Sequence, residues 1–403
     1  MRLQSLLTNS AFMVTSQVAS LITPLYVTII ASQYYTGNVF SANLLAISIA
    51  SALFIFNDLG LYQLIIKKFT EVRNEQKLTS DVLSLIYSQR LLSVFISTAL
   101  LALLPSIGDY SSITSYLFII TVGVISQAFQ PIWIFQAFED VRFYCVFNII
   151  SKIINLTVVS ICIFGYDNPY APVLGFAISN FFLAISLNTF LHVSGYKVYL
   201  VNPMKVWALV REGRNYTIAR LSILTYTGLI SFLVGINDIA AAGIVALAEQ
   251  LYKAIQLSVS PIIQVLIPYC ERVRDSQLVY KLLAGLIIIL SVSAIIVGYF
   301  GSQAVLYLWG ISSEREVATL LVYFGAAGLN TISSLIGFPL FSTFGHYEKT
   351  NYSSIVNGLF SLLIVTVAFV YFDQLLSSII LICEISLLTI RISHVGYLRS
   401  IKR

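Results

Sequence analysis

Long apolar runs recur along the whole chain and constrain its fold more than any other feature. Each run is roughly 20 residues long, the length that a helix needs to cross the hydrocarbon of a bilayer. The runs lack the period-two alternation of barrel strands. With 58% hydrophobic and only 10% charged residues, the composition excludes a soluble domain. Because unpaired backbone groups cannot face lipid, the runs predict membrane-spanning helices.

The runs predict an all-α, polytopic transmembrane helical bundle of about twelve spans. The first run is too long for the core of a signal peptide, so it is interpreted as a retained first span. The predicted spans cover residues 10–31, 38–66, 81–104, 112–137, 143–164, 172–194, 215–235, 240–267, 280–301, 318–344, 350–372 and 375–394.

Lys and Arg residues gather in the loops that follow even-numbered spans. The three largest groups lie at residues 67–77, 197–214 and 272–281, and most of the 23 Lys and Arg fall on that side. Since cytoplasmic loops carry an excess of these residues, both termini are predicted to be cytoplasmic. The net charge of +5 is explained by membrane topology, and no nucleic-acid partner is expected.

The two halves of the chain share short similarities at equivalent places. Residues 72–76 (VRNEQ) follow the second span, and residues 273–277 (VRDSQ) follow the eighth. Pro131 and Pro339 are each followed by an acidic residue and a tyrosine at the same spacing. A parallel duplication predicts this pattern, and transporters commonly contain such repeats. We expect two pseudo-symmetric six-helix lobes: residues 1–194 and 215–403, joined by a cytoplasmic linker at residues 195–214.

Two segments carry a resemblance to a known family. Residues 130–139 (QPIWIFQAFE) contain a characteristic pattern of proline, aromatic, glutamine and acidic residues: Pro131, Trp133, Phe135, Gln136 and Glu139. Residues 248–269 begin with Ala-Glu and end in a proline-rich stretch. On these segments the chain resembles the Wzx-type polysaccharide flippases of the multidrug/oligosaccharidyl-lipid/polysaccharide (MOP) exporter superfamily. In the loop after Glu139 the chain departs from the family at Asp140, so this loop is assigned no substrate contact.

The resemblance implies a transporter, not an enzyme, in the bacterial cytoplasmic (inner) membrane. Its implied substrate is an undecaprenyl-pyrophosphate-linked oligosaccharide, an O-antigen repeat unit, flipped from the cytoplasmic to the periplasmic leaflet by alternating access. Besides this lipid-linked oligosaccharide and membrane lipids, the candidate partners are a proton or Na+ if transport is ion-coupled, and a polysaccharide polymerase or chain-length regulator. No cofactor is expected.

Cationic residues inside the predicted spans are the candidate substrate-binding residues. A charge in hydrocarbon costs at least a few kcal/mol, so it usually faces a cavity or a partner. Arg90 and Lys152 lie roughly 13 Å inside their spans, and Lys253 lies deeper. A cationic chamber would suit a pyrophosphate or an acidic sugar. We therefore expect Arg90, Lys152 and Lys253 to line the chamber, with Arg220 as a further candidate.

Each of these cations also has a structural alternative. For Arg90 and Lys152 the alternative is a misplaced span boundary or a structural pair with Asp58, and Lys253 lies four residues after Glu249 on the same helical face. Arg220 and Arg391 lie near the cytoplasmic ends of their spans, so their long side chains could instead reach the membrane interface.

Three acidic residues are candidates for ion coupling or gating: Asp58, Glu249 and Glu384. As alternatives, Asp58 could cap its helix before Gly60, and Glu384 could pair with Arg391. Five prolines within predicted spans indicate kinks that shape a cavity, hinge the lobes or serve only packing: Pro24, Pro131, Pro261, Pro268 and Pro339.

No catalytic or metal-binding motif is present in the sequence. The 3 His residues have no ligand spacing, and no nucleophile elbow or phosphate-binding loop occurs. The nearest alternative function is another MOP-type exporter, of lipids or of drugs. From a different class, a membrane polysaccharide polymerase would need a large catalytic outer loop, whereas the longest predicted here, residues 302–317, has three charged residues: Glu314, Arg315 and Glu316. The half-to-half similarity and the buried cations argue against a purely structural membrane protein.

Overall fold

The computed structural model describes residues 2–35, 37–72, 75–107, 113–138, 141–273, 281, 284–285, 288, 307–309, 313–344, 346, 348–371 and 373–402. These residues form α-helices with short 3-10 and π-helical turns, and no strand occurs among them. In the same residues, nine helices are long and apolar enough to cross a membrane, or ten if one bent pair is counted as a span. The all-α, multi-pass architecture is thereby confirmed. The count of twelve stays a prediction, because most of the predicted span 280–301 lies outside the described residues.

The chain forms two compact units. Unit 1 comprises Met1–Leu221 with Gly235–Ile239, and unit 2 comprises Ser222–Val234 with Ala240–Arg403. Residues 195–214 belong to unit 1 in this division. The lobe boundaries expected from the sequence stay a prediction.

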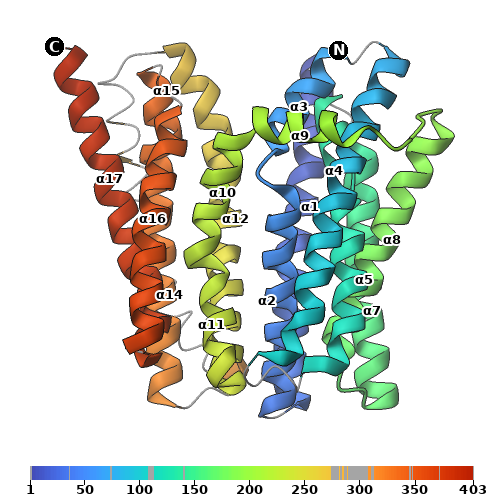
Figure 1. Ribbon diagram of the computed structural model, residues 1–403, viewed down its shortest axis with the longest axis vertical. Helices are drawn as coiled ribbons and strands as arrows, with labels where there is room; N and C mark the ends of the chain where they lie inside the picture. The colour runs from blue at the N-terminus through green and yellow to red at the C-terminus, as the bar shows by residue number, and fades with distance from the viewer. Residues whose placement is uncertain are drawn as a thin grey trace. The chain divides into compact units, whose positions relative to one another are not determined.

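The spans of unit 1 run side by side, as Figure 1 shows in blue to green. Its helices are α1 (Arg2–Tyr34), α2 (Asn38–Asp58), α3 (Tyr62–Glu71), α4 (Gln76–Leu103), α5 (Leu117–Ala128), α6 (Ile132–Ala137), α7 (Val141–Tyr166), α8 (Ala171–Val193), α9 (Pro203–Glu212) and the first part of α10 (Arg214–Thr227). Of these, α7 packs on both α1 and α8, and α5 also packs on α8.

The predicted span 38–66 extends too far, because the span ends at Asp58 and residues 62–66 belong to a separate helix. Helix α2 ends at Asp58, and the next two residues are left-handed, with φ 48° at Leu59 and 65° at Gly60. A glycine adopts this conformation without strain. Gly60 also lies tightly against α10, since an added Cβ would come within 2.6 Å of the Tyr216 carbonyl oxygen. Asn57, Asp58 and Gly60 mark this break in the sequence, but apolar residues on both sides of it led the span to be predicted through residue 66.

Helix α3 pairs with α6, the segment that carries the proline-aromatic motif. Pro131 marks the break between α5 and α6. The ring of Trp133 stacks on that of Phe69 with 5.3 Å between centroids, and the hydroxyl of Tyr62 donates to the side-chain carbonyl of Gln136. These aromatic residues form the centre of a buried cluster with α4 and α8. The motif therefore has a packing role, because it joins α6 to α3, α4 and α8 in unit 1.

The segment between α8 and α9, residues 195–202, lies along α4 and is here named the strap. Alternate backbone N–H groups of the strap donate to serine hydroxyls spaced four residues apart on α4, one after another. The bonds join Lys197 to Ser80 (3.2 Å), Tyr199 to Ser84 (3.1 Å) and Val201 to Ser88 (3.0 Å). An extended chain repeats every two residues and a helix face every four, so the two patterns match in register.

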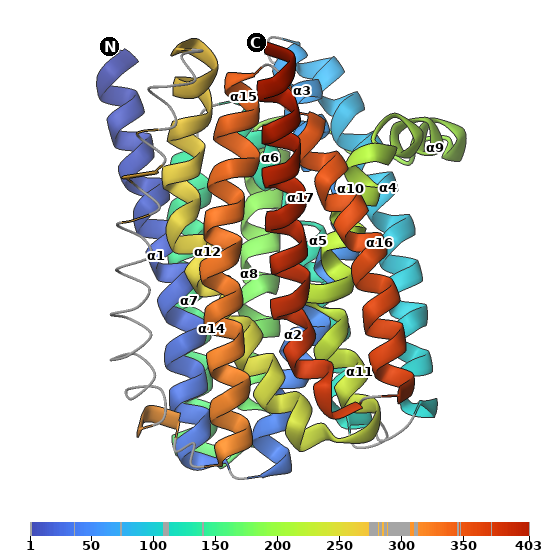
Figure 2. The same cartoon turned by 90° about the vertical axis from the view of Figure 1, so that its left-hand side faces the viewer.

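Helix α9 lies across the spans of unit 1 instead of along them (Figures 1 and 2). Asn202 caps its start, since the side-chain oxygen accepts from the backbone N–H of Met204 at 2.9 Å. Pro203 occupies the first turn, as is common in helices. The buried residues Val206 and Leu209 face inward, and Leu209 joins the cluster around α3. The opposite face of α9 is exposed.

Unit 2 contains the remaining helices, coloured yellow-green to red in Figure 1. They are the end of α10, most of α11 (Leu229–Asn237), α12 (Ile239–Val273), α14 (Glu314–Leu335), α15 (Phe341–Thr343), α16 (Glu348–Tyr371) and α17 (Ile379–Lys402). Helix α17 packs on α14 and α16. Pro339 lies in a π-helical turn, Ile336–Leu340, that follows α14.

The prolines differ in what they do. Pro131 and Pro339 both mark an interruption of α-helix, whereas Pro24 lies inside the continuous helix α1. Pro261 and Pro268 fall within α12, where their side chains are outside the described part of the chain. The hinge role of all five stays a prediction.

Candidate functional site

Arg90 lies in a buried ion pair at the end of α2. Its guanidinium Nη2 is 2.5 Å from Oδ1 of Asp58, and its Nη1 donates to the backbone oxygen of Asn57 at 2.5 Å. Arg90 is 2% exposed. The carbonyl of Asn57 is one of those that a helix end leaves without an intrahelical partner. Arg90 thus neutralises Asp58 and also caps α2, which is the structural alternative that the sequence left open.

Polar side chains on one face of α4 complete this cluster. The Asn57 backbone oxygen also accepts from the Gln89 amide and the Ser93 hydroxyl, both at 3.3 Å. The Ser97 hydroxyl donates to the Asn57 side-chain oxygen at 2.6 Å. Ser93 and Ser97 are spaced four residues apart, so the helix presents them to α2 together with Gln89.

Lys152 lies in the middle of α7 and is half-buried. Its ammonium group has neither a hydrogen bond nor an ion pair within the part of the chain that the structure describes. Asn148 and Asn155 lie on the same helical face, one turn before and about one turn after it. Asn148 donates to the hydroxyls of Ser16 and Ser20 on α1, at 2.8 and 2.9 Å. Lys152 is therefore a cation within a polar stripe of a membrane span.

Lys253 forms an ion pair with Glu249, the residue one turn earlier on α12. The Nζ atom is 3.7 Å from Oε2 of Glu249. The Glu249 side chain is almost fully buried and that of Lys253 is partly exposed. The local pairing expected from their spacing is present. Arg220, the fourth predicted cation, is exposed on α10, and its Cβ lies against Gly60.

Glu384 is fully buried on α17 and accepts hydrogen bonds from two neighbouring helices of unit 2. The Tyr252 hydroxyl donates at 2.5 Å, and the Asn330 amide donates at 3.0 and 3.1 Å to its two oxygens. Gln256 in turn donates to the Asn330 side-chain oxygen at 2.8 Å. Both direct donors are uncharged.

The partners of Glu384 were missed by the sequence analysis. The candidate site residues within the spans were all charged, whereas Asn330 and Gln256 are neutral. A search for uncharged amides within apolar runs would have found both, because a buried amide also needs partners.

Arg391 is buried between α14 and α16, so the expectation that it reaches the membrane interface is wrong. It is 3% exposed. Its guanidinium donates to the hydroxyls of Ser333 at 3.0 Å and Ser353 at 3.4 Å. Gly337 makes room for it, since an added Cβ would come within 2.6 Å of the guanidinium carbon. The Arg391 guanidinium is thus held by hydrogen bonds and close packing inside unit 2 and does not reach water at the membrane interface.

The charged residues thus form separate groups within each unit. Unit 1 contains the Arg90–Asp58 pair and Lys152, whereas unit 2 contains the Lys253–Glu249 pair and Glu384. Among the residues that the structure describes, no three His, Cys, Asp or Glu side chains are placed to hold a metal ion.

Comparisons with known proteins agree with this architecture. A family model described as polysaccharide biosynthesis protein matches residues 6–274. A putative O-antigen transporter of Escherichia coli (strain K12) is 23% identical over 328 residues, which are 78% of this chain and 78% of that protein.

Two solved structures show the same fold at low sequence identity. A multidrug resistance MATE family transporter of the MOP superfamily, in an inward-facing conformation, has a TM-score of 0.70 and 12% identity, with 96% of each chain covered. The lipid II flippase MurJ, in an inward closed conformation, has a TM-score of 0.69 and 12% identity, covering 97% of this chain and 87% of that one. The chain belongs to the polysaccharide biosynthesis protein family, with the fold of MOP-superfamily transporters.

Proposed function

We propose that the protein is a transporter that flips a lipid-linked oligosaccharide across the bacterial cytoplasmic membrane. The specific substrate proposed is an undecaprenyl-pyrophosphate-linked O-antigen repeat unit, moved from the cytoplasmic to the periplasmic leaflet by alternating access. The family match and the similarity to a putative O-antigen transporter support this substrate class. The basic loops support cytoplasmic termini.

The proposal depends above all on one observation: Lys152 lies half-buried in the middle of a membrane span. An ammonium group in the middle of a span is costly unless something anionic neutralises it at some stage of the cycle. Among the described residues it has no ion-pair partner, so its charge is available to a phosphate of the substrate. Arg90 and Lys253 already have carboxylate partners. Arg90, Lys253 and the exposed Arg220 are therefore weaker candidates for substrate binding than Lys152.

Glu384 is the proposed ion-coupling residue, ahead of Asp58 and Glu249. Asp58 and Glu249 each pair with a cation, which reduces the advantage of taking up a proton or Na+. Glu384 accepts only from the uncharged donors Tyr252 and Asn330 among the described residues. Its carboxylate could thus gain a proton without the loss of a hydrogen-bonded ion pair, although Arg391 on the same helix interacts with it electrostatically.

The test is complementation of a flippase-deficient bacterium, with surface polysaccharide scored at matched protein levels. Wild type is expected to restore the polysaccharide, Lys152→Ala to abolish it and Lys152→Arg to keep part of it, because the charge is retained. Lys197→Ala, which removes an exposed lysine of the strap, is the matched control and should behave as wild type.

Each failure has a distinct meaning in this test. Full activity of Lys152→Ala would exclude Lys152 as the anion-binding residue. If wild type restores nothing in any strain tested while the protein is present, the flippase assignment is wrong. Drug resistance without polysaccharide would instead support a multidrug exporter.

A further inference from the structure

The strap and α9 both expose apolar and basic side chains. Leu200 is 80% exposed, Met204 79% and Trp207 70%. Lys197, Lys205 and Arg211 are exposed alongside them. A helix with a packed inner face, exposed apolar side chains and flanking cations is typical of an element that lies in the membrane interface. Tryptophan in particular prefers this region.

The level on α4 at which the strap ends and α9 begins agrees with an interfacial location of α9. After Leu78 in the first turn of α4, the next exposed large apolar side chain of this helix is Leu91, and such side chains then continue to Leu103. The strap makes its last serine bond to Ser88, three residues before Leu91, and α9 begins directly after it. The chain therefore turns away from α4 into α9 at the level where this run of exposed apolar side chains starts.

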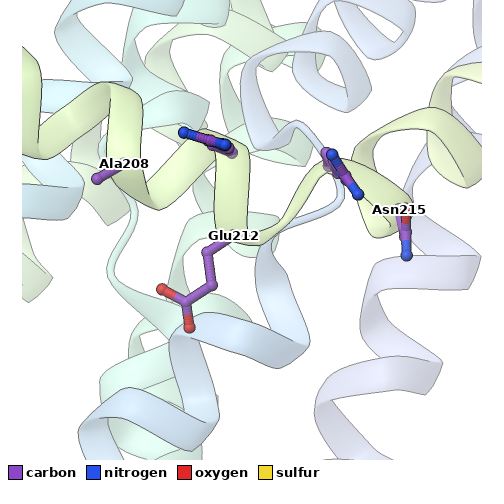
Figure 3. A pocket seen from close by; sticks show the side chains of 5 residues that line it. Ala208, Glu212 and Asn215 are labelled. Atoms are coloured by element: carbon purple, nitrogen blue, oxygen red, sulfur yellow. The ribbon is translucent and has the colours of Figure 1, made fainter.

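A basic pocket lies at the end of α9, where the chain turns into α10 (Figure 3). It has a volume of about 540 Å³ and is lined by Ala208, Arg211, Glu212, Arg214 and Asn215. Within the described part of the chain, neither guanidinium group forms a hydrogen bond or an ion pair. The Glu212 carboxylate is neutralised by Lys68, whose Nζ is 2.8 Å from Oε2. The pocket thus presents two unpaired guanidinium groups and one amide.

We propose that this pocket binds the phosphate of an anionic phospholipid while α9 lies in the surrounding leaflet. Guanidinium groups bind phosphate through paired hydrogen bonds. The exposed apolar face of α9 favours a phosphate that is attached to a lipid, because the same face would contact its acyl chains. Cations near an anionic bilayer surface contribute in the same direction. This lipid site is distinct from the proposed transport residues, and its occupancy does not require transport.

The pocket is tested by lipid titration of the full chain in detergent. Trp207 lies one turn before Arg211, so its fluorescence reports on the pocket, and Trp207→Phe identifies its contribution. The probes are dihexanoyl-phosphatidylglycerol, dihexanoyl-phosphatidylcholine and inorganic phosphate. We expect phosphatidylglycerol to bind most tightly. Arg211→Gln/Arg214→Gln should weaken it roughly 30-fold, which is about 2 kcal/mol at 1.4 kcal/mol per factor of ten.

The matched control is Lys77→Gln/Arg142→Gln, which removes the same charge from other exposed positions of unit 1. This variant should keep the affinity within about twofold, in line with weak long-range effects of exposed charges. Elution and thermal stability in detergent establish that both variants are folded. Equal binding of the two lipids, equal losses in both double variants, or unchanged affinity of the pocket variant would overturn the site. Inorganic phosphate that binds as tightly as phosphatidylglycerol would show a free-anion site and overturn the lipid assignment.

The depth of α9 is tested in vesicles that contain phosphatidylglycerol with bromines near the headgroup. Trp133 and Trp309 are buried, whereas Trp207 is exposed. The quenched component of the fluorescence should disappear in Trp207→Phe. Quenching that is unchanged in this variant would place α9 outside the interface and contradict the proposal.

Discussion

Removal of the Arg90 guanidinium should destabilise unit 1 through Asp58. In Arg90→Ala, the carboxylate of Asp58 loses its ion pair at 2.5 Å and the Asn57 carbonyl loses a donor. Breaking a buried pair by removing one partner costs about 3–5 kcal/mol, because an uncompensated charge is left behind. The lost helix-end hydrogen bond alone accounts for about 1–3 kcal/mol of such a loss.

A second substitution separates the charge effect from the loss of packing. In Arg90→Ala/Asp58→Ala the uncompensated carboxylate is absent, so the double variant should be more stable than Arg90→Ala by about 0.5–3 kcal/mol, the range of interaction energies between residues in direct contact. A residue that serves only the substrate would show no such recovery.

The assay is thermal stability of the full chain in detergent, followed by the loss of monodisperse protein on size exclusion. At about 2–4 °C per kcal/mol for a unit of this size, Arg90→Ala should lower the apparent melting temperature by roughly 6–20 °C. The double variant should recover roughly 1–12 °C. Lys152→Ala is the control and should lie within about 2 °C of wild type, because no ion pair among the described residues is broken.

Two outcomes would refute this reasoning. A wild-type melting temperature for Arg90→Ala would mean that the pair contributes nothing to stability. A double variant no more stable than Arg90→Ala would mean that Asp58 is not left uncompensated. Loss of polysaccharide in Arg90→Ala at unchanged stability would instead place Arg90 in the transport path.

Three further predictions follow from the described contacts. Gly60→Ala should lower the melting temperature more than Gly37→Ala, since both have positive φ but only Gly60 is crowded, and equal effects would show that strain alone matters. Glu384→Gln should keep the protein level and thermal stability but abolish polysaccharide export, and full export would exclude Glu384 as the coupling residue. Ser84→Ala/Ser88→Ala should speed amide hydrogen exchange in the strap by roughly 5- to 150-fold, for about 1–3 kcal/mol of lost hydrogen bonding; unchanged exchange would show that other contacts hold the strap.

The sequence alone predicted most of the architecture, because its signals are local. An apolar run of spanning length has few ways to satisfy its backbone in a bilayer, and so the helices follow from composition. The Glu249–Lys253 contact also follows from sequence, since residues four apart share a helical face. The proline-aromatic motif carried the family resemblance, which the family model confirms.

Only the tertiary structure decided which buried groups meet. Asp58 and Gly60 signalled a possible helix end, but the close packing of Gly60 against α10 is visible only in the tertiary structure. Arg90 bonds Asp58 across 32 residues, and Glu384 bonds Tyr252 across 132. Burial dictates that such groups need partners. Which partner each one finds depends on how the helices pack, and that is set by the complementary shapes of many side chains together.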